Sequence, residues 1–399
     1  MNCDVIIIGG GIIGLSTAYQ ITKTTPWKKI MILEKEIEVG LHQTGHNSGV
    51  IHSGIYYKPG SLKAKLCRKG IIDLTQFCDQ KGIRFEMCGK VIIASEKQQL
   101  PLLDMLIQRG KENGIKNLKK LSSYDIKHYE PYAEGQAGIF CPETGIIDYN
   151  DVCNALKEDF EKFGEIKLGH EATKIELDGN KVIVHSGKKT FKTSFLINCA
   201  GLFSDKIAKL AKMENRIKIV PFRGEYYSLK KESRYLVKNL IYPVPNPMYP
   251  FLGVHFTRTI NRDIECGPNA VFTFKREGYN KTDFSFKDTL QALAFRGTWK
   301  LFINHWKFGI NEYRRAFSKY LFLKEIRKMI PTLNMDDIVQ QRSGVRAMAL
   351  AKNGEVIDDF LIVKSKKNIH ILNAPSPAAT ACISIAKKIM IDASDYFKI

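Results

Sequence analysis

The first apolar pattern in the chain lies in residues 4–8, where Asp4 is followed by an unbroken β-branched run that ends at glycines. An apolar run of this length without polar alternation is typical of a strand buried on both faces of a parallel sheet. Residues 12–23 then carry apolar side chains at helical spacing, and residues 29–34 form a second apolar run. Together these segments predict one β-α-β unit of about thirty residues.

The later pattern mixes helical and strand periodicities without any internal repeat. Helical spacing recurs in three segments, at 61–81, 96–113 and 148–163. Further strands are predicted at 89–94, within 171–200, across a meander at 219–275, and near 360–363 and 369–372. A turn is predicted at 178–180, where the sequence reads Asp-Gly-Asn. A Pro/Ala loop and a closing helix are expected to end the chain, with the helix starting near Ala379 or Thr380.

The turn after the first strand matches the dinucleotide-binding pattern G-x-G-x-x-G. In that pattern Gly9 allows a tight turn, Gly11 lets the backbone approach a pyrophosphate, and Gly14 lets helix and strand pack closely. The helix N-terminus offers free N–H groups and a partial positive charge to phosphate oxygens. Glu34 lies 20 residues after Gly14, where an acid accepts hydrogen bonds from ribose hydroxyls. This fingerprint alone fits either FAD or NAD.

Three later segments favour FAD over NAD. Residues 42–49 form a small polar loop punctuated by glycine, placed where an extended FAD needs donors along its ribityl chain and pyrophosphate. Residues 50–54 follow as an apolar stretch that ends in a histidine beside small residues. Residues 195–201 are a strand ending in a tight turn, which can bring a distant part of the chain back to the cofactor.

Composition narrows the class of protein only a little. The chain of 399 residues holds 61 basic and 41 acidic residues, a formal net charge of +20, which could attract nucleic acid, an anionic membrane or an acidic substrate. Its nine cysteines form no C-x-x-C pair, so we expect free thiols, no disulfide framework and no metal site. Neither a secretory signal nor an apolar run long enough to span a membrane is apparent.

Several long stretches resemble one family of flavoenzymes. The sequence looks like the D-amino-acid-oxidase superfamily and, within it, the L-2-hydroxyglutarate dehydrogenase/oxidase family. The stretches that carry this resemblance are 42–64, 221–227, 242–258, 267–279, 344–347, 357–360 and 373–380. The resemblance implies an α/β fold with a Rossmann-like FAD-binding domain and a mixed-sheet α+β substrate domain.

The same resemblance implies a domain division. The FAD-binding domain is expected to be discontinuous, over 1–80, 145–215 and 335–399. The substrate domain is expected over 81–144 and 216–334, including a basic aromatic helical region at 286–329.

The implied reaction is oxidation of L-2-hydroxyglutarate to 2-oxoglutarate, with hydride passing to flavin N5 and electrons passing on to quinone or oxygen. An amino acid, sarcosine or glycerol-3-phosphate is the alternative substrate. A base must take the hydroxyl proton, and histidine suits this role near neutral pH. His52 is the first candidate and His255 the second, although either could merely bind cofactor or backbone. His42 and His46 are further histidines within the matching motifs.

A dicarboxylate substrate calls for fixed cationic donors, which arginine provides better than lysine. Three arginines lie in the matching motifs, Arg223, Arg258 and Arg346. Tyr57, Tyr242 and Lys275 could add donors, and each arginine could instead be structural.

The positions expected to contact FAD come from the fingerprint, the polar loop and the later motifs. They are Gly9, Gly11, Ile12, Ile13, Gly14, Glu34, Lys35, Thr44, His46, Asn47, Ser48, Gly49, Val50, Ala172, Ala200, Gly201, Gly344, Arg346, Pro377, Ala378, Ala379 and Thr380. A helix N-terminus near Ala379 would favour negative charge on the flavin pyrimidine edge. No motif indicates a covalent flavin link.

Residues 287–328 hold ten basic and three acidic residues, interleaved with Trp299, Trp306 and several phenylalanines. A basic face beside Trp and Phe is typical of a helix that lies on an anionic bilayer. The alternative is a helix pair that packs its aromatics onto the substrate domain. A third reading, RNA binding, rests on charge alone, so we expect no nucleic-acid partner. The expected location is cytoplasmic, with peripheral contact to the inner membrane as the alternative.

Overall fold

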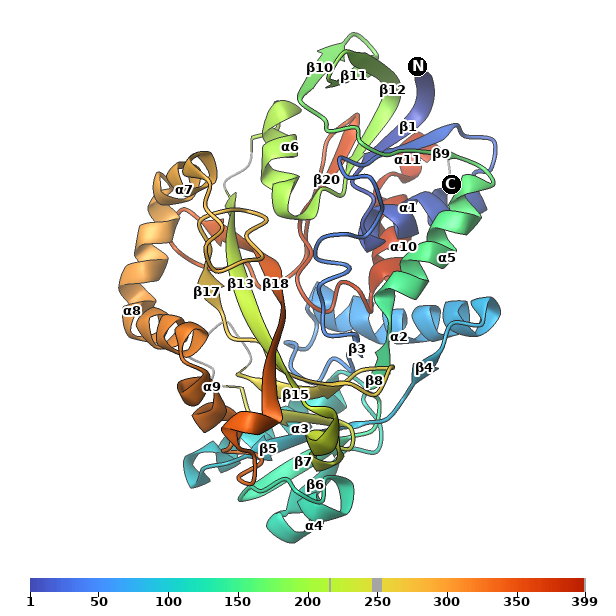
Figure 1. Ribbon diagram of the computed structural model, residues 1–399. Coiled ribbons are helices and arrows are strands. Elements are labelled where there is room, and N and C mark those ends of the chain that lie inside the picture. Colours follow the sequence, from blue (N-terminus) through green and yellow to red (C-terminus); the bar gives the residue numbers. More distant parts are fainter. Residues whose placement is uncertain (215–216, 246–252, 398–399) are drawn as a thin grey trace.

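The predicted β-α-β unit opens the fold. A computed structural model describes residues 1–214, 217–245 and 253–397 (Figure 1). β1 (Asn2–Ile8) is buried over its second half and pairs in parallel with β2 (Ile30–Leu33), and α1 (Ile12–Thr24) connects them. The β-branched run of β1 has no polar side chain to place toward solvent, so it lies in the middle of the sheet.

This first sheet has eight strands, five of which form a parallel core. The main path runs β10-β11-β12-β1-β2-β9, with β20 beside β12 and β19 beside β20. The bounds of the strands not yet given are β9 Glu165–Lys167, β10 Lys174–Asp178, β11 Lys181–Ser186, β12 Lys189–Asn198, β19 Leu361–Lys364 and β20 Asn368–Asn373. Segments from both ends of the chain therefore build one sheet.

Helices cover both faces of this sheet. On one face α1 packs with α2 (Leu62–Lys81), α5 (Tyr149–Glu161) and α10 (Cys382–Asp392) around a core that includes Val5, Leu15 and Ile385. On the other face α6 (Ser204–Leu210) lies over residues such as Ile6 and Leu196. The alternation of Ile6 and Ile7 between the two cores explains why the buried half of β1, residues 5–8, is apolar at every position.

A second sheet of nine strands forms the other half of the molecule. Its path runs β17-β13-β16-β15-β14-β5-β7-β6, with β18 along the free side of β13. The strands are β5 Lys90–Ala94, β6 Lys119–Ser122, β7 Ala137–Cys141, β13 Ile217–Leu229, β14 Leu240–Pro243, β15 His255–Arg258, β16 Ile264–Gly267, β17 Val271–Phe272 and β18 Ile338–Ala351. The long pair β13–β18 forms the wall that faces the first sheet (Figure 1).

The remaining helices and short turns pack on the two sheets or connect their strands. The helices and short 3-10 turns are η1 Lys97–Gln99, α3 Leu100–Glu112, α4 Ser123–Tyr129, η2 Gly201–Phe203, η3 Lys231–Leu236, α7 Phe286–Leu293, α8 Arg296–Phe317, α9 Lys319–Ile326, η4 Met335–Asp337 and α11 Ser394–Phe397. A small sheet of β3 (Val50–Ile51), β8 (Gly145–Ile147) and β4 (Phe85–Glu86) lies between the two units. Within the described ranges, no helix is both long enough and apolar enough to span a bilayer.

The predicted fold class is confirmed, and two details differ from expectation. β18 pairs with β13 along its length, so residues 338–351 belong to the substrate-side sheet, although 335–399 was predicted to lie in the FAD-binding domain. Only β19, β20 and the last helices return to the first sheet. The closing helix begins at Cys382, because residues 377–381 form hydrogen-bonded turns first. Residues 246–252, within one matching motif, lie outside the described part of the chain.

Candidate active site

A cavity of about 1800 Å³ lies between the two units. It is lined by the β1–α1 turn, the 40–48 loop, residues 344–349 of β18 and the loop 373–379. Typical single-ligand pockets occupy roughly 300–1,000 Å³. The cavity therefore has room for a dinucleotide and a small substrate together.

The glycine turn forms one end of this cavity and fits a pyrophosphate. Gly9 has a positive φ of 108°, and a Cβ there would lie 2.5 Å from the carbonyl oxygen of Cys199. A Cβ on Gly14 would lie 2.0 Å from the carbonyl oxygen of Gly9. Gly11 is the N-cap of α1 and supplies no side-chain cap; the Ile12 N–H donates to Thr44, and the N–H groups of Ile13 and Gly14 can bind phosphate.

Glu34 lies at the end of β2, where the ribose is expected. Its carboxylate accepts hydrogen bonds from the backbone N–H of Gly10 at 2.6 Å and of Glu36 at 2.9 Å. A carboxylate offers about four lone-pair sites, so capacity for ribose hydroxyls is left. Glu34 thus fixes the turn as well as facing the cavity.

The polar loop after β2 is held by its own side chains. Thr44 Oγ1 accepts a hydrogen bond from the Ile12 N–H at 3.1 Å, and Asn47 Oδ1 accepts one from the Gly49 N–H at 2.8 Å. His46 Nδ1 lies 2.8 Å from the carbonyl oxygen of Ser343, which ties the loop to β18. These bonds place the loop along the middle of the cavity.

Most of the expected FAD contacts line the cavity. They are Gly9, Gly11, Ile12, Ile13, Glu34, Lys35, Thr44, His46, Asn47, Ser48, Val50, Ala172, Ala200, Gly201, Gly344, Arg346, Pro377, Ala378 and Ala379. Three expected contacts are not among the lining residues and lie next to them in the chain: Gly14, Gly49 and Thr380. Gly49 has a φ of 64°, and the hydroxyl of Thr380 accepts a hydrogen bond from the His52 N–H at 3.1 Å. These positions shape the wall without forming its surface.

Because α10 begins at Cys382, the expected helix N-terminus at Ala379 is replaced by a turn. The Ala381 N–H donates to the Pro377 carbonyl at 3.0 Å, and the Cys382 N–H donates to the Ala379 carbonyl at 3.3 Å. The backbone of this loop, rather than the first turn of the helix, faces the cavity.

The two candidate bases lie in the same part of the cavity. Burial, with smaller contributions from Lys90, His255 and Lys63, lowers the pKa of His52 to about 3. Burial also lowers the pKa of His255 to about 3. His255 Nδ1 lies 2.9 Å from the Gly253 carbonyl oxygen and must carry the proton, which leaves the Nε2 lone pair free to accept one. His52 Nε2 lies 3.1 Å from the hydroxyl of Ser376.

Only one of the three candidate arginines lines the cavity. Arg346, on β18, donates from Nη1 to the Asn269 carbonyl at 2.9 Å, and burial lowers its pKa. Arg223 instead pairs with the buried Glu225 at 2.7 Å, and Arg258 pairs with Glu86 at 2.5 Å. Both lie outside the cavity lining, as does Lys275. Glu225 lies on β13 of the second sheet and Glu86 on β4 of the small sheet, so both guanidinium groups already have carboxylate partners.

Tyr57 and Tyr242 both line the cavity, as the sequence analysis expected. The ring of Tyr242 stacks on His255 with centroids 3.9 Å apart. Sequence reasoning missed the neighbouring Tyr56 and the contact of Ser376 with His52, although both lie in the matching motifs. It also missed the buried Lys90, which lies behind the rings of Tyr56 and Tyr242 and on the same strand face as Ile92.

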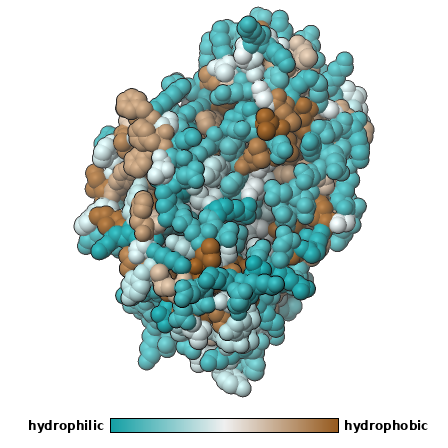
Figure 2. Space-filling view, in the orientation of Figure 1, coloured by the Kyte–Doolittle hydropathy of each residue, from teal (hydrophilic) through white to brown (hydrophobic). Residues whose placement is uncertain are grey.

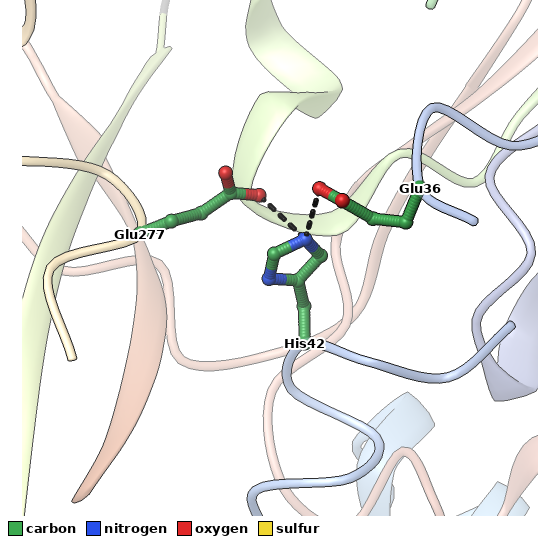
Figure 3. A group of neighbouring side chains, drawn as sticks. All are labelled: Glu36, His42 and Glu277. Carbon is green, nitrogen blue, oxygen red and sulfur yellow. Dashed lines mark hydrogen bonds and ion pairs between the residues drawn. The ribbon is translucent and has the colours of Figure 1, made fainter. Parts of the chain in front are cut away.

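Glu36, His42 and Glu277 form the one cluster of possible metal ligands in the described part of the chain (Figure 3). His42 Nε2 lies 2.9 Å from an oxygen of each carboxylate. Lys35 Nζ lies 2.7 Å from Glu277 and also pairs with Glu36, so a cation already neutralises the acids. The cluster therefore ties the loop after β2 to the substrate-side unit through ion pairs.

Comparison with known proteins agrees with this architecture. The family described as "FAD dependent oxidoreductase" matches residues 4–390. An L-alpha-glycerophosphate oxidase from Mycoplasma pneumoniae with FAD bound superposes with a TM-score of 0.80 at 22% identity, covering 98% of this chain and 94% of that one. A glycine oxidase from Geobacillus kaustophilus gives 0.74 at 13% identity, covering 98% and 94%. The fold and the cavity thus define an FAD-dependent oxidoreductase, and the preference for FAD over NAD is confirmed.

Sequence relatives identify the branch of this class. An L-2-hydroxyglutarate dehydrogenase from Indibacter alkaliphilus is 49% identical over 96% of this chain and 97% of its own length. The enzyme of that name from Escherichia coli K12 is 43% identical over 97% and 92%. The chain belongs to the L-2-hydroxyglutarate dehydrogenase family.

Proposed function

We propose that this protein oxidises L-2-hydroxyglutarate to 2-oxoglutarate with FAD as its cofactor. The observation that carries the proposal is the single cavity that brings His52, His255 and Arg346 beside a dinucleotide cradle. Relatives at 41–49% identity over nearly the full chain bear the name of this activity. When bound, FAD supplies the two-electron acceptor for the hydrogen on the substrate Cα.

We assign the base role to His52. Its pKa of about 3 leaves the ring neutral at physiological pH, so it can accept the hydroxyl proton. A bound dianion nearby raises that pKa during the reaction, because an opposite charge favours the protonated ring. His255 is more buried and its ring is stacked on Tyr242, so it is better placed to orient the substrate.

Arg346 is the cation assigned to the substrate α-carboxylate. Its guanidinium is buried at the cavity wall and remains charged, although burial lowers its pKa. A planar forked donor holds a carboxylate in one orientation. A carboxylate fixed by Arg346, together with a hydroxyl held at His52, limits the directions that the Cα–H bond can take.

The test is anaerobic reduction of the purified yellow protein, followed by stopped-flow absorbance. We expect bleaching with L-2-hydroxyglutarate and none with the D-enantiomer, L-lactate, glycine or glycerol 3-phosphate. His52→Ala should slow bleaching by about 10²–10⁴-fold with its FAD content kept. The exposed His128, on α4, gives the matched control His128→Ala, which should reduce at the wild-type rate. Equal rates for His52→Ala and His128→Ala would remove His52 from the mechanism.

We further propose that α7 and α8 rest on an anionic membrane surface and that electrons pass to a quinone dissolved there. Trp299, Ile303, Trp306 and Ile310 lie on α8, two on each side of a kink at His305, and each is at least 50% exposed. Other aromatics of this region, such as Phe322, pack inward onto the substrate-side sheet. Apolar side chains gather over α7 and α8 in Figure 2. With a net charge of +7 over 287–328, this face suits acidic lipid.

Vesicle co-sedimentation tests the membrane contact, and an exposed tryptophan elsewhere in the chain provides a matched control. Trp299→Ser/Trp306→Ser should weaken binding to phosphatidylglycerol vesicles at least tenfold. Trp27→Ser removes a tryptophan that is 72% exposed on the other unit and should leave binding unchanged. If Trp299→Ser/Trp306→Ser bound vesicles as well as Trp27→Ser does, the membrane contact would be refuted. If oxygen but not a soluble quinone reoxidised the reduced flavin rapidly, the quinone acceptor would be refuted.

A further inference from the structure

Lys90 is a buried ammonium group without a carboxylate partner in the described part of the chain. It is the first residue of β5 and is 1% exposed. Its side chain lies on the same strand face as Ile92, which points into the core beside the cavity. A buried charge is normally paired, because desolvation without a partner is costly. An unpaired one in this position therefore requires an explanation.

The two aromatic rings that face Lys90 carry no charge. Its Nζ lies 4.4 Å from the ring centroid of Tyr56 and 4.7 Å from that of Tyr242, and both rings line the cavity. Burial raises the pKa of both tyrosine hydroxyls, which stay protonated. Four further groups interact with it electrostatically, namely Cys67, Cys141, His52 and His255. Burial raises the pKa of Cys67 to about 12, so this thiol supplies no counter-charge.

The Tyr56 hydroxyl is a second unsatisfied group at the same place. It is buried and has no hydrogen-bond partner among the described residues. A buried hydroxyl without a partner is uncommon and often marks the position of a ligand atom. A cation therefore lies directly behind the rings of Tyr56 and Tyr242 in the cavity wall, beside an orphan hydroxyl, whereas Arg346 lines the cavity from β18.

We infer that Lys90 and Tyr56 form the subsite for the distal carboxylate of the substrate, and that Lys90 determines the preference for dicarboxylates over monocarboxylates. This inference rests on the proposed function. The Tyr56 hydroxyl donates a hydrogen bond to the carboxylate, and Lys90 supplies the balancing charge from behind the two tyrosine rings. The chemical class recognised is a five-carbon 2-hydroxy acid with a second carboxylate.

The protonation of Lys90 gives the inference a pH signature. Burial lowers the pKa of Lys90 to about 8 in the free protein. A carboxylate bound nearby favours the ammonium form and raises this pKa. Preference for the dicarboxylate should therefore fall as pH rises through about 8, whereas His52 and His255, with pKa values of about 3, do not titrate there.

The experiment compares L-2-hydroxyglutarate with L-2-hydroxypentanoate, which has a methyl group in place of the distal carboxylate. Lys90→Met keeps the shape of the side chain and removes its charge. It should raise KM for L-2-hydroxyglutarate at least tenfold, change kcat less than threefold, and leave KM for L-2-hydroxypentanoate within about twofold. Tyr56→Phe should show the same selectivity with a smaller rise in KM. Equal effects on the two substrates, or no effect, would overturn the inference.

A second measurement does not depend on whether the variants fold. In the wild-type holoenzyme, the ratio of kcat/KM values for the two substrates should fall at least fivefold between pH 7 and pH 9. A constant ratio would contradict a role for Lys90. If the holoenzyme oxidises neither substrate, the proposed function itself fails, and this result is distinguishable from oxidation of both without discrimination.

Discussion

Gly14→Ala should disrupt the FAD cradle, although the same substitution stabilises most helices. An added Cβ would lie 2.0 Å from the carbonyl oxygen of Gly9, whereas Cβ atoms essentially never approach closer than 3.0 Å. The turn and the helix must therefore separate by about 1 Å. Overpacking of this kind costs about 1–3 kcal/mol, which exceeds the gain of roughly 1 kcal/mol from helix propensity.

The shift moves the pyrophosphate-binding backbone away from the phosphates. If half of the strain energy is expressed as lost cofactor binding, about 0.5–1.5 kcal/mol, the FAD dissociation constant rises about two- to twelvefold, because about 1.4 kcal/mol corresponds to one factor of ten. Titration of apoprotein with FAD, followed by quenching of flavin fluorescence, measures this constant. Thermal unfolding with and without FAD measures the accompanying loss of stability.

Gly309→Ala is the matched control. Gly309 lies inside α8, and a Cβ there would meet nothing within 4 Å. We expect unchanged FAD affinity and a free energy of unfolding higher by about 0.5–1 kcal/mol. If Gly14→Ala behaved like this control, the close-packing role of Gly14 would be refuted.

Two further predictions concern ion pairs. Arg276, which is 2% exposed, binds both carboxylate oxygens of Asp205 at 2.5 and 2.9 Å, so Arg276→Met should lower the free energy of unfolding by about 3–5 kcal/mol in urea titration; a loss under 1 kcal/mol would contradict this. Burial opposes protonation of His42, but hydrogen bonds to Glu277 and Glu36, beside Lys35, outweigh it and raise its pKa. Protonated His42 therefore stabilises the fold below pH of about 6.5 and loses this effect as pH rises through the raised pKa, so the stability gap between wild type and His42→Gln should shrink from pH 6 to pH 9. A gap independent of pH would exclude this ion pair.

Much of the FAD-binding half could be predicted from local sequence. The glycine turn, the helix after it and Glu34 depend on contacts within about thirty residues, and their physical requirements leave few alternatives. The resemblance in the 42–64 stretch then placed the polar loop and His52 correctly along the cavity. Local sequence was sufficient to predict this half because binding a dinucleotide requires these residue types at these spacings.

The substrate end depended on pairing between distant segments. β18 was predicted to lie in the FAD-binding domain, but it pairs with β13 in the second sheet. This pairing places Arg346 in the cavity wall. Arg223, on β13, forms an ion pair with Glu225 instead. Nothing local distinguishes these arginines, since both stand in matching motifs. From the sequence alone, Lys90 is the polar first residue of a strand, which is usually exposed. Its burial depends on the neighbouring strands of the sheet.

The sequence by itself determined the cofactor class, the α/β architecture and the segments that meet the dinucleotide, because turn geometry and periodicity act over short distances. Only the tertiary structure decided which charged side chains line the cavity. Burial, pairing and charge neutralisation depend on neighbours hundreds of residues away, as in the contact of Ser376 with His52.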